Sequence, residues 1–549
     1  MSDKVYGIDL GTTYSAVALV NDDGIPEIVK NFVGEDTTPS VVFFDEDGTV
    51  VIGSQAKQTQ VSDPENACSL IKRHMGEEGF EQTILGRRYS AADLRGQEYT
   101  PESISALILK ELVSDANSQN NLDINKVVIT VPAYFGTQER QATKQAGEIA
   151  GLEVVGIIPE PVAAAISLCA RQEQDQTLLI FDLGGGTFDT TILKSCAGQV
   201  EVVAIDGNRL LGGADWDQCL EDMFLDRFKE QAGLDDDNDP SFDEDFMTEL
   251  RVEVEDAKKT LTQRASANIL LRYQDKKEHV KVTREEFEEA TSHLVAQTIE
   301  ITRRVIETAQ DKFPGLTVDR YLLVGGSSRM PMIRTALAEA GFNTENTDFD
   351  LSVAKGAAIF GQGELPVPGF AEMSAGATDS ASADSGDSKP MFGIGPGRTV
   401  VTNVLSRGLG VRLVRENDKG EFEEYVNFLA HANETLPLVA SLTGGIVEDG
   451  QSSVEVSLFE QGGEVESEDT RDNKAMISGP STTIEGLPPM RRGDPIEVTL
   501  EVSEEGVATL LVVEPTTGRS FRAEAAVSVL SQEDVKKAKK QIAQIMTRS

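Results

Sequence analysis

The sequence of 549 residues contains few of the residue types that mark metal-binding, disulfide-rich or membrane proteins. It has four histidines, one tryptophan and four cysteines without a C-x-x-C pair, which argues against a zinc site or a disulfide framework. No apolar run approaches the roughly 18 residues of a membrane span, and Asp9 in the first apolar stretch argues against a signal peptide. We therefore expect a protein of a reducing, cytoplasmic compartment whose four thiols are buried and free: Cys68, Cys169, Cys196 and Cys219.

Positive charge is also scarce, because 50 Lys and Arg stand against 92 Asp and Glu, giving a net charge of −42. Nucleic-acid binding needs a basic face that displaces counterions, so this balance argues against DNA or RNA partners. It argues equally against adhesion to anionic membranes. The hydrophobic content of 39% is normal for a folded protein, so the acidity predicts solubility and repulsion and not disorder.

The composition divides the chain into four parts. Residues 1–368 alternate apolar strands with amphipathic helices, which indicates an α/β domain. Residues 369–398 are rich in Ser, Asp, Ala and Gly and predict a linker. Residues 399–530 show strand-like alternation between turns, which predicts an antiparallel β domain, and residues 531–549 predict a short amphipathic helix.

Several patterns place individual elements. Val127–Val131 predicts a buried strand, and the helix after it begins near Thr137. In the β domain, Ser453–Leu458 and Ile496–Val502 alternate strictly and each predicts one strand. The helix that follows has one apolar stripe, formed by Val535, Ala538, Ile542 and Ile545.

An internal repeat carries the first chemical signal. Tyr6–Thr13 (YGIDLGTT) and Ile180–Thr187 (IFDLGGGT) each join a strand to an Asp, a Leu, glycine and a small hydroxyl residue. A second strand-like run follows both copies, so each turn is predicted to be a hairpin between strands. The P-loop pattern G-x-x-x-x-G-K-[ST], which leads from a strand into a helix, is absent.

These two turns favour phosphate binding. Their glycines let backbone N–H groups approach an anion, and Thr12, Thr13 and Thr187 add hydroxyl donors. Asp9 and Asp182, just before the turns, are suited to hold a hydrated Mg²⁺ that bridges phosphate oxygens. Two tight hairpins without a ligand are the alternative.

Two further segments fit the rest of a nucleotide. In Leu322–Met330 (LLVGGSSRM) a buried strand ends in paired glycines, a surface that can lie flat against a base, with Arg329 able to stack on it. Another predicted helix places Glu255, Lys258 and Thr262 on one face, where they could bond ribose and base. Taken singly, ordinary strand–helix packing and a solvated ion pair explain the two segments as well.

Together the motifs resemble the heat-shock protein 70 family, the DnaK-type chaperones. The resemblance rests on the two turns and on four further segments: 128–135 (VITVPAYF), 140–144 (RQATK), 325–331 (GGSSRMP) and 486–499 (GLPP followed by RGDPIEVT). It implies a duplicated actin-like (ribonuclease H-like) two-lobed ATPase domain, then an antiparallel β-sandwich and a short C-terminal helix.

The resemblance also implies site residues, matched position by position. Its catalytic set is Lys72, Glu160, Asp182, Thr187 and Asp189. Its nucleotide-binding set is Gly11, Thr12, Thr13, Tyr14, Gly184, Gly185, Gly186, Thr187, Gly213, Glu255, Lys258, Lys259, Thr262, Gly325, Gly326, Ser327, Arg329 and Asp350. Mg²⁺ would be held through waters by Asp9 and Asp182, and K⁺ is a second candidate ion.

The implied function is that of an ATP-dependent chaperone. Hydrolysis of ATP to ADP and phosphate would control how the β domain holds extended, unfolded polypeptide, with a J-domain co-chaperone and a nucleotide-exchange factor as candidate partners. One alternative is a nucleotide-switched scaffold or co-chaperone that binds ATP without cycling on unfolded clients. Another is a sugar kinase of the same superfamily, which would leave the β domain without a role.

Four departures from the family pattern motivate the scaffold alternative. Only Ser531–Met546 stands where the family has a long helical lid, and Arg398–Leu405 replaces its leucine-rich linker. Val155–Gly156 stands where a basic residue usually precedes the acidic turn at Glu160, and the charged run Val414–Glu421 replaces the arch over the peptide cleft. These changes predict weaker peptide retention, linker docking and co-chaperone recruitment.

Overall fold

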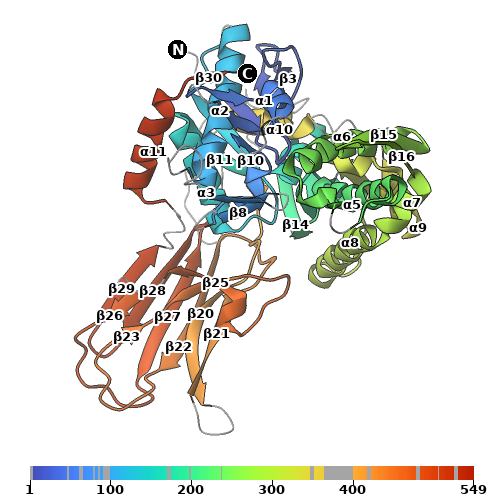
Figure 1. Cartoon of the computed structure of the whole chain (residues 1–549). Helices are drawn as coiled ribbons and strands as arrows, with labels where there is room; N and C mark the ends of the chain where they lie inside the picture. The colour runs from blue at the N-terminus through green and yellow to red at the C-terminus, as the bar shows by residue number, and fades with distance from the viewer. Residues whose placement is uncertain are drawn as a thin grey trace.

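The computed structural model contains two sheets of matching topology, each the centre of one lobe. The residues that the structure describes are 4–45, 48–60, 63, 66–77, 81–84, 87–90, 99–120, 122–169, 175–196, 199–235, 238–345, 351–363, 400–416, 422–477, 482–504, 506–524 and 530–548. The lobes occupy the upper part of Figure 1 and a β domain lies below them.

The first sheet has the order β11-β10-β1-β2-β3, with the short β4 also paired to β2. The central strand β1 is antiparallel to β2 and parallel to β10. Its members are β1 (Val5–Asp9), β2 (Tyr14–Val20), β3 (Pro26–Val29), β4 (Thr38–Pro39), β10 (Lys126–Val131) and β11 (Glu153–Pro159).

The second sheet repeats this arrangement in the order β18-β17-β12-β13-β14-β19. Here β12 is antiparallel to β13 and parallel to β17, as β1 is to β2 and β10. Its members are β12 (Gln176–Leu183), β13 (Phe188–Cys196), β14 (Gln199–Asn208), β17 (Arg320–Val324), β18 (Thr344–Glu345) and β19 (Val400–Thr402). The sequence repeat is therefore a repeat of strand–turn–strand units, as predicted.

The two lobes meet at a close crossing of two helices rich in small residues. A Cβ atom at Gly356 would lie 1.7 Å from the carbonyl oxygen of Ala163 in the other helix, and strand β1 packs as closely, since a Cβ at Gly7 would lie 2.2 Å from the backbone nitrogen of Ala358. Glycine is required where backbones approach this closely. The two helices are α4 (Glu160–Cys169) and α10 (Ser352–Gln362).

Helices cover the outer faces of both lobes. The first lobe carries α2 (Pro101–Asn120), α3 (Thr137–Ile149) and a hairpin of β8 (Glu81–Ile84) and β9 (Arg87–Ser90). The second carries α5 (Gly213–Ala232), α6 (Glu244–Gln263), α7 (Arg284–Ala290), α8 (Ser292–Lys312), α9 (Pro331–Glu339) and a hairpin of β15 (Ser266–Tyr273) and β16 (Lys276–Thr283). The predicted strand at Val127–Val131 and the helix from Thr137 are confirmed as β10 and α3.

A small sheet beside the first lobe has the order β30-β6-β5-β7. It leads into α1 and a 3₁₀-helix, both of which reach the central cleft. The elements are β5 (Val42–Phe44), β6 (Val50–Ile52), α1 (Ser54–Thr59), β7 (Ala67–Cys68), the 3₁₀-helix (Ile71–His74) and β30 (Thr547–Arg548).

The β domain consists of two four-stranded antiparallel sheets around one apolar core. One sheet is β20 (Leu409–Glu416), β21 (Phe422–Ala430), β24 (Leu458–Gln461) and β25 (Asn473–Ile477). The other is β22 (Leu438–Gly445), β27 (Pro495–Val502), β28 (Ala508–Glu514) and β29 (Arg519–Glu524). A further pair is β23 (Val454–Glu455) with β26 (Thr483–Ile484).

One strand prediction was correct and another was wrong. Ile496–Val502 lies within β27, and its apolar side chains are buried in alternation. Ser453–Leu458 is not one strand, because the chain leaves the pairing of β23 with β26 and enters β24, which pairs with β20 and β25. The alternation still reports burial correctly, since Val454, Val456 and Leu458 all face the core.

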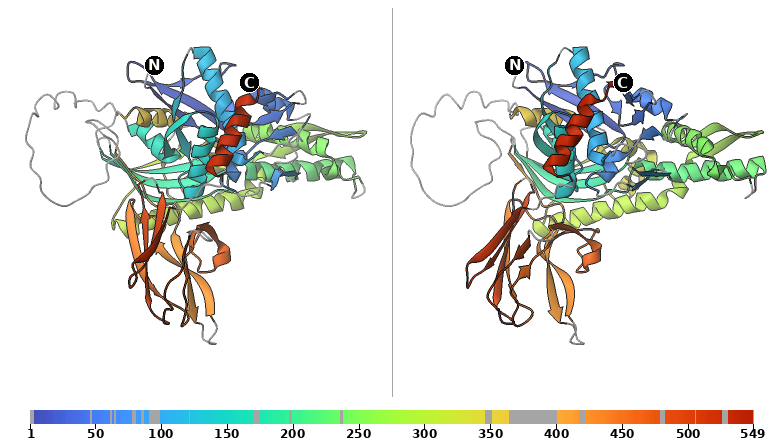
Figure 2. Two further views of the ribbon diagram at one scale, coloured as in Figure 1. Left: turned by 90° about the vertical axis from the view of Figure 1, so that its left-hand side faces the viewer. Right: turned by 60° about the vertical axis from the view of Figure 1, so that its left-hand side comes forward.

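The predicted amphipathic helix is α11 (Gln532–Gln544), and it packs on the first lobe, as Figure 2 shows. Val535 and Ile542 are buried in the core of that lobe. Lys110 on α2 donates to the carbonyl oxygens of Ile542 and Ile545, at 3.0 and 2.7 Å. The apolar stripe is thus confirmed, and the surface that it packs against belongs to the first lobe.

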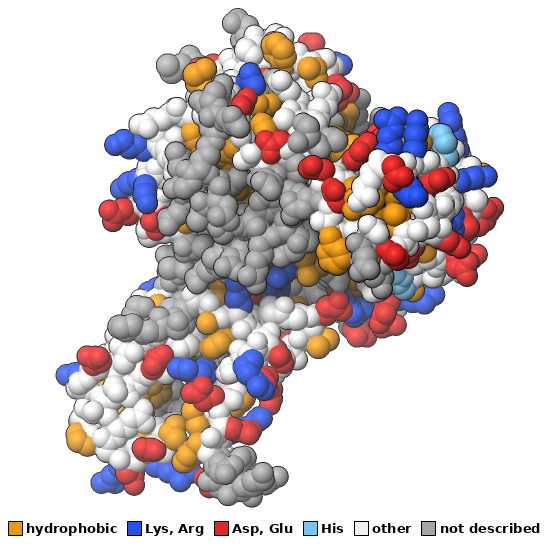
Figure 3. Space-filling model, viewed as in Figure 1, with side chains coloured by type: hydrophobic (Ala, Val, Ile, Leu, Met, Phe, Trp, Pro, Cys, Tyr) orange, Lys and Arg blue, Asp and Glu red, His pale blue; other side chains and the backbone are white. Residues whose placement is uncertain are grey.

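The surface is mixed in charge. On the face seen in Figure 3, acidic side chains are spread over the second lobe and the β domain, with Lys and Arg among them. Cys68 is a buried free thiol, as predicted, and burial raises its pKa to about 12, whereas Cys219 is a free thiol that is only partly buried. Among the described residues, no helix combines the length and hydropathy that crossing a membrane requires.

Candidate functional site

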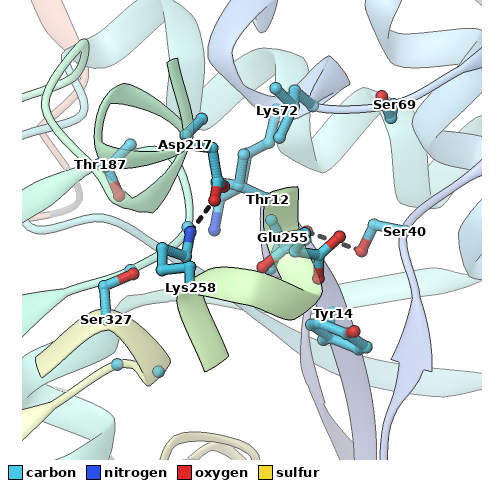
Figure 4. A pocket seen from close by; sticks show the side chains of 18 of the residues that line it. Thr12, Tyr14, Ser40, Ser69, Lys72, Thr187, Asp217, Glu255, Lys258 and Ser327 are labelled. Carbon is cyan, nitrogen blue, oxygen red and sulfur yellow. Dashed lines mark hydrogen bonds and ion pairs between the residues drawn. The ribbon is translucent and has the colours of Figure 1, made fainter. Parts of the chain in front are cut away.

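A cleft of about 550 Å³ lies between the two lobes, and both repeated turns contribute to its wall. Figure 4 shows side chains from both lobes pointing into it. Strands β1 and β12 end at the cleft, so Asp9, the last residue of β1, and Asp182, the second-to-last residue of β12, come together from opposite halves of the chain.

The first turn is held by hydroxyl groups. The backbone N–H of Gly11 donates to Ser15 Oγ at 3.2 Å, and Ser40 Oγ donates to the Gly11 carbonyl at 2.8 Å. A Cβ at Gly11 would lie 2.0 Å from the Tyr14 carbonyl oxygen, so only glycine fits this tight bend. The bend leaves Thr12, Thr13 and Tyr14 lining the cleft.

The second turn faces the first at contact distance. A Cβ at Gly185 would lie 2.3 Å from Thr13 Cγ2, and one at Gly186 would lie 2.5 Å from Thr12 Cγ2. Glycines in the second turn therefore let the two turns meet. A polyphosphate entering here would have N–H and hydroxyl donors on both sides, which suits an anion.

Lys72 brings a cation to the inner end of the cleft. It lies on the 3₁₀-helix after β7, is 4% exposed, and its Nζ is 2.5 Å from Glu160 Oε1. The neighbouring Arg73 fastens the second turn, because its Nε donates to the Gly186 carbonyl at 2.8 Å.

Carboxylates crowd around this lysine. Burial and the negative charges of Glu160, Asp189 and Asp9 raise the pKa of Asp182 well above its usual range. Burial and the charge of Glu160 raise the pKa of Asp189 to about 8. Such mutual repulsion is relieved by a cation, so the cluster favours a metal ion or bound cationic group.

Mg²⁺ fits this cluster by charge and by ligand type, because hard oxygen ligands are those that it prefers. Within the described part of the chain, no three His, Cys, Asp or Glu side chains are close enough together to ligate a metal directly. The arrangement therefore suits an ion that keeps much of its water shell, the usual habit of Mg²⁺.

The outer part of the cleft carries a second set of charges. Glu255 on α6 bonds Lys57 of α1 at 2.7 Å, which joins the two lobes across the opening, and Lys259 at 2.9 Å. Burial works against the charged form of Glu255, but the two ammonium groups outweigh it and hold its pKa at about 2.

A third group lies on the floor of the outer cleft. Lys258 bonds Asp217 at 2.6 Å, as drawn in Figure 4, and the Gly213 carbonyl at 2.8 Å. Gly325 has a φ of 82°, and a Cβ there would lie 2.6 Å from Asp182 Oδ1. No atom would contact a Cβ at Gly326 within 4 Å, so this glycine presents a flat, open surface to the cleft.

Most predicted site residues meet in this one cleft. Its wall includes Asp9, Gly11, Thr12, Thr13, Tyr14, Lys72, Glu160, Asp182, Gly184, Gly185, Thr187, Glu255, Lys258, Lys259, Thr262, Gly325, Gly326, Ser327 and Arg329. Gly186, Asp189 and Gly213 are not part of this wall, although Gly186 packs against Thr12 and Gly213 against Ser327, and Asp350 lies outside the described residues. Asp189 is 2% exposed, and its Oδ1 accepts from the backbone N–H of Tyr134 at 3.2 Å.

Sequence reasoning missed several residues of this site, among them Ser40, Lys57, Arg73 and Asp217. Arg73 adjoins Lys72, and Asp217 lies one helical turn after Gly213, so their neighbours could have signalled them. Nothing in the local sequence marks Ser40 or Lys57, because their partners lie in other elements.

The geometry defines a class of protein: two lobes of repeated topology enclose a cleft suited to a polyphosphate, and a β domain follows them. A family model described as "Hsp70 protein" matches residues 5–369 and 416–548. The chain is also 35% identical over 531 residues to "Chaperone protein DnaK" from two strains of Halobacterium salinarum, covering 94% of this chain and 74% of each relative. The chain belongs to the Hsp70 family.

Membership settles the general activity. The protein is an ATP-dependent chaperone of the Hsp70 type, an ATPase that acts in protein folding. The family binds ATP and ADP, generally with Mg²⁺, and DnaK-type members bind unfolded polypeptides. Neither the scaffold alternative nor the sugar kinase is favoured by any feature of the site.

Proposed function

We propose that this chain binds Mg–ATP between its two lobes and uses hydrolysis to control how its β domain holds extended polypeptide. The observation that carries the proposal is the contact of the two glycine turns across the cleft, beside a buried lysine and a cluster of carboxylates. The fold that goes with it is a duplicated actin-like (ribonuclease H-like) ATPase. We propose its limits as 1–368, followed by a linker at 369–398, a β-sandwich at 399–530 and a helical segment at 531–549.

The inner cleft would carry out the chemistry. Thr12, Thr13 and the backbone N–H groups of both turns would bind the phosphates, and Lys72, held by Glu160, would neutralise charge on the transferred group. Bound through water near Asp9 and Asp182, Mg²⁺ would supply further charge neutralisation. Phosphoryl transfer needs positioning more than covalent catalysis, so Thr187, Asp182 and Asp189 would orient the attacking water.

The outer cleft would hold the adenosine. Glu255, Lys258, Lys259 and Thr262 on α6 would bond ribose and base, and Gly325–Arg329 would form the opposite wall. Lysine at position 259 keeps the charge that an arginine would give but lacks its planar stacking surface.

The β domain would be coupled to the cleft through contacts that already join them. Strand β19 is parallel to β14 as the edge strand of the second sheet, although its sequence predicts weakened docking. The side-chain amide of Asn433 bonds both the N–H and the carbonyl of Ile205 on β14, at 2.8 and 3.2 Å. A change in the cleft can therefore alter the β domain, and a change in the β domain can alter the cleft.

Partners and location complete the proposal. Extended unfolded polypeptide is the proposed client, and a J-domain co-chaperone and a nucleotide-exchange factor are candidate partners that binding assays with purified proteins would test. We propose a cytoplasmic location, in keeping with the free thiols of Cys68 and Cys219.

A substitution at Gly185 tests the nucleotide site. Gly185→Val would put a side chain where a Cβ already meets Thr13 at 2.3 Å, so we expect loss of ATP binding in calorimetry. Gly463→Val in the β domain is the matched control. The atom nearest to a Cβ at Gly463 is 3.8 Å away, so there is room for the added side chain. Unchanged ATP affinity in Gly185→Val would refute the proposed site.

A further inference from the structure

A buried carboxylate lies where the first lobe meets the β domain. Glu139 on α3 is 2% exposed, and three cations surround its Oε1: Lys474 at 3.7 Å, with Arg209 and Arg407 each at 3.9 Å. Burial works against the charged form, but these cations, with Arg407 the strongest, lower the pKa of Glu139. A buried charge must be compensated, and two of its three cations come from beyond residue 400.

The residues before and after Arg407 tie this part of the backbone to the first lobe and to the β domain. It lies between β19 and β20, and its side chain is 11% exposed. The preceding Ser406 donates through Oγ to the Phe135 carbonyl of the first lobe at 3.0 Å. The following Gly408 donates through its N–H to Gln461 Oε1 of the β domain at 3.0 Å. The backbone that carries the guanidinium is thus fixed at the junction of the first lobe and the β domain.

The same guanidinium covers the ring of Tyr134, with Cζ 5.3 Å from the ring centroid. The backbone of the same tyrosine contacts the carboxylates of the cleft, because the N–H of Tyr134 donates to Asp189 Oδ1. A Cβ at Gly207 would lie 3.1 Å from the Tyr134 ring and 3.2 Å from Asp189 Oδ1, so ring and carboxylate pack against one surface. One short segment therefore contacts the β-domain junction and the ATP site together.

We propose that Arg407 is a positioning residue for ATP hydrolysis. By neutralising Glu139 and covering the Tyr134 ring, it holds the β domain on the first lobe and fixes the amide that orients Asp189. The inference rests on the role proposed above for Asp189. It assigns Arg407 no contact with the nucleotide.

The test compares single-turnover ATP hydrolysis by the full chain and its variants. Arg407→Gln should slow hydrolysis about fivefold while the dissociation constant for ATP stays within twofold. Glu139→Gln combined with Arg407→Gln should recover most of the rate, because it removes the buried charge of Glu139, which also repels the buried Glu460, together with the cation that faces both carboxylates. Arg412→Gln is the matched control, since Arg412 pairs with Glu455 at 3.1 Å on the β domain itself and should leave the rate unchanged.

Each outcome has a defined meaning. A wild-type rate in Arg407→Gln, or a double variant no faster than the single one, would overturn the inference. The double variant also keeps the test decisive where the single variant loses its fold in thermal unfolding. A wild-type rate in Asp189→Asn would instead refute the role proposed for Asp189, and with it the step on which the inference rests.

Discussion

Replacement of Lys72 by alanine is the sharpest perturbation of the proposed catalytic centre. Its ammonium group is 4% exposed and 2.5 Å from Glu160, among carboxylates where burial and mutual repulsion together raise the pKa values of Asp182 and Asp189. Lys72→Ala removes this positive charge from the inner end of the cleft, while the turns proposed to bind phosphate remain.

The expected loss follows from the charge. Two unit charges about 4 Å apart at an effective dielectric constant of about 20 interact by about 4 kcal/mol. Charge on the transferred group is spread over several oxygens and shared with other donors, so we expect about two thirds of that value to be lost. A loss of about 2.7 kcal/mol corresponds to hydrolysis about a hundredfold slower.

The assay is single-turnover hydrolysis of labelled ATP, with ATP affinity measured separately. Because Glu160 would be left buried without its partner, the single variant should also lose about 3–5 kcal/mol of stability. Combining Lys72→Ala with Glu160→Gln should recover stability but not rate, which separates catalysis from folding. Lys229→Ala, which breaks a pair with Asp239 away from the cleft, is the matched control. A Lys72→Ala rate within threefold of wild type would refute the reasoning.

Three further predictions follow from the fold and the charge. Lys57→Ala breaks the half-buried ion pair between Lys57 and Glu255 across the cleft opening, which is worth about 1 kcal/mol. Labelled ADP should therefore dissociate about fivefold faster in stopped flow. An unchanged dissociation rate would show that this ion pair does not retain the nucleotide. Gly356→Val places a side chain at the helix crossing, where the Cβ of residue 356 would lie 1.7 Å from the Ala163 carbonyl oxygen. The free energy of unfolding, measured by chemical denaturation, should fall by about 3 kcal/mol or more. An unchanged free energy of unfolding would show that the helix crossing is loose. Raising NaCl from about 0.1 to about 1 M shortens the Debye length from about 10 to about 3 Å and so screens repulsion between surface charges. Because the chain has a net charge of −42, its thermal unfolding midpoint should rise. A lower unfolding midpoint would show that ion pairs stabilise the fold more than repulsion destabilises it.

Much of the site could be predicted because its backbone is local in sequence. The turns after Asp9 and Asp182 need glycine and hydroxyl residues within a few positions, so each turn is readable by itself. Their repetition predicted two halves that meet, and the sheets pair in the same order around β1 and β12.

The interactions between elements that are far apart in the sequence could not be predicted from local patterns. Lys57 and Glu255 are 198 residues apart, and neither is unusual in its own helix. Arg407 lies just after the Arg398–Leu405 segment that departs from the family's linker, and nothing near it in sequence identifies Glu139 as its partner. Likewise, β19 lacks the leucines expected of a docking strand, yet backbone hydrogen bonding to β14 does not depend on side-chain identity.

The central claim is that ATP hydrolysis in the cleft is coupled to polypeptide binding by the β domain. The most direct measurement is single-turnover ATP hydrolysis by the full chain, with and without a saturating unfolded peptide. The account predicts that peptide accelerates hydrolysis and that ATP in turn weakens peptide binding. Identical rates and nucleotide affinities with and without peptide would contradict it.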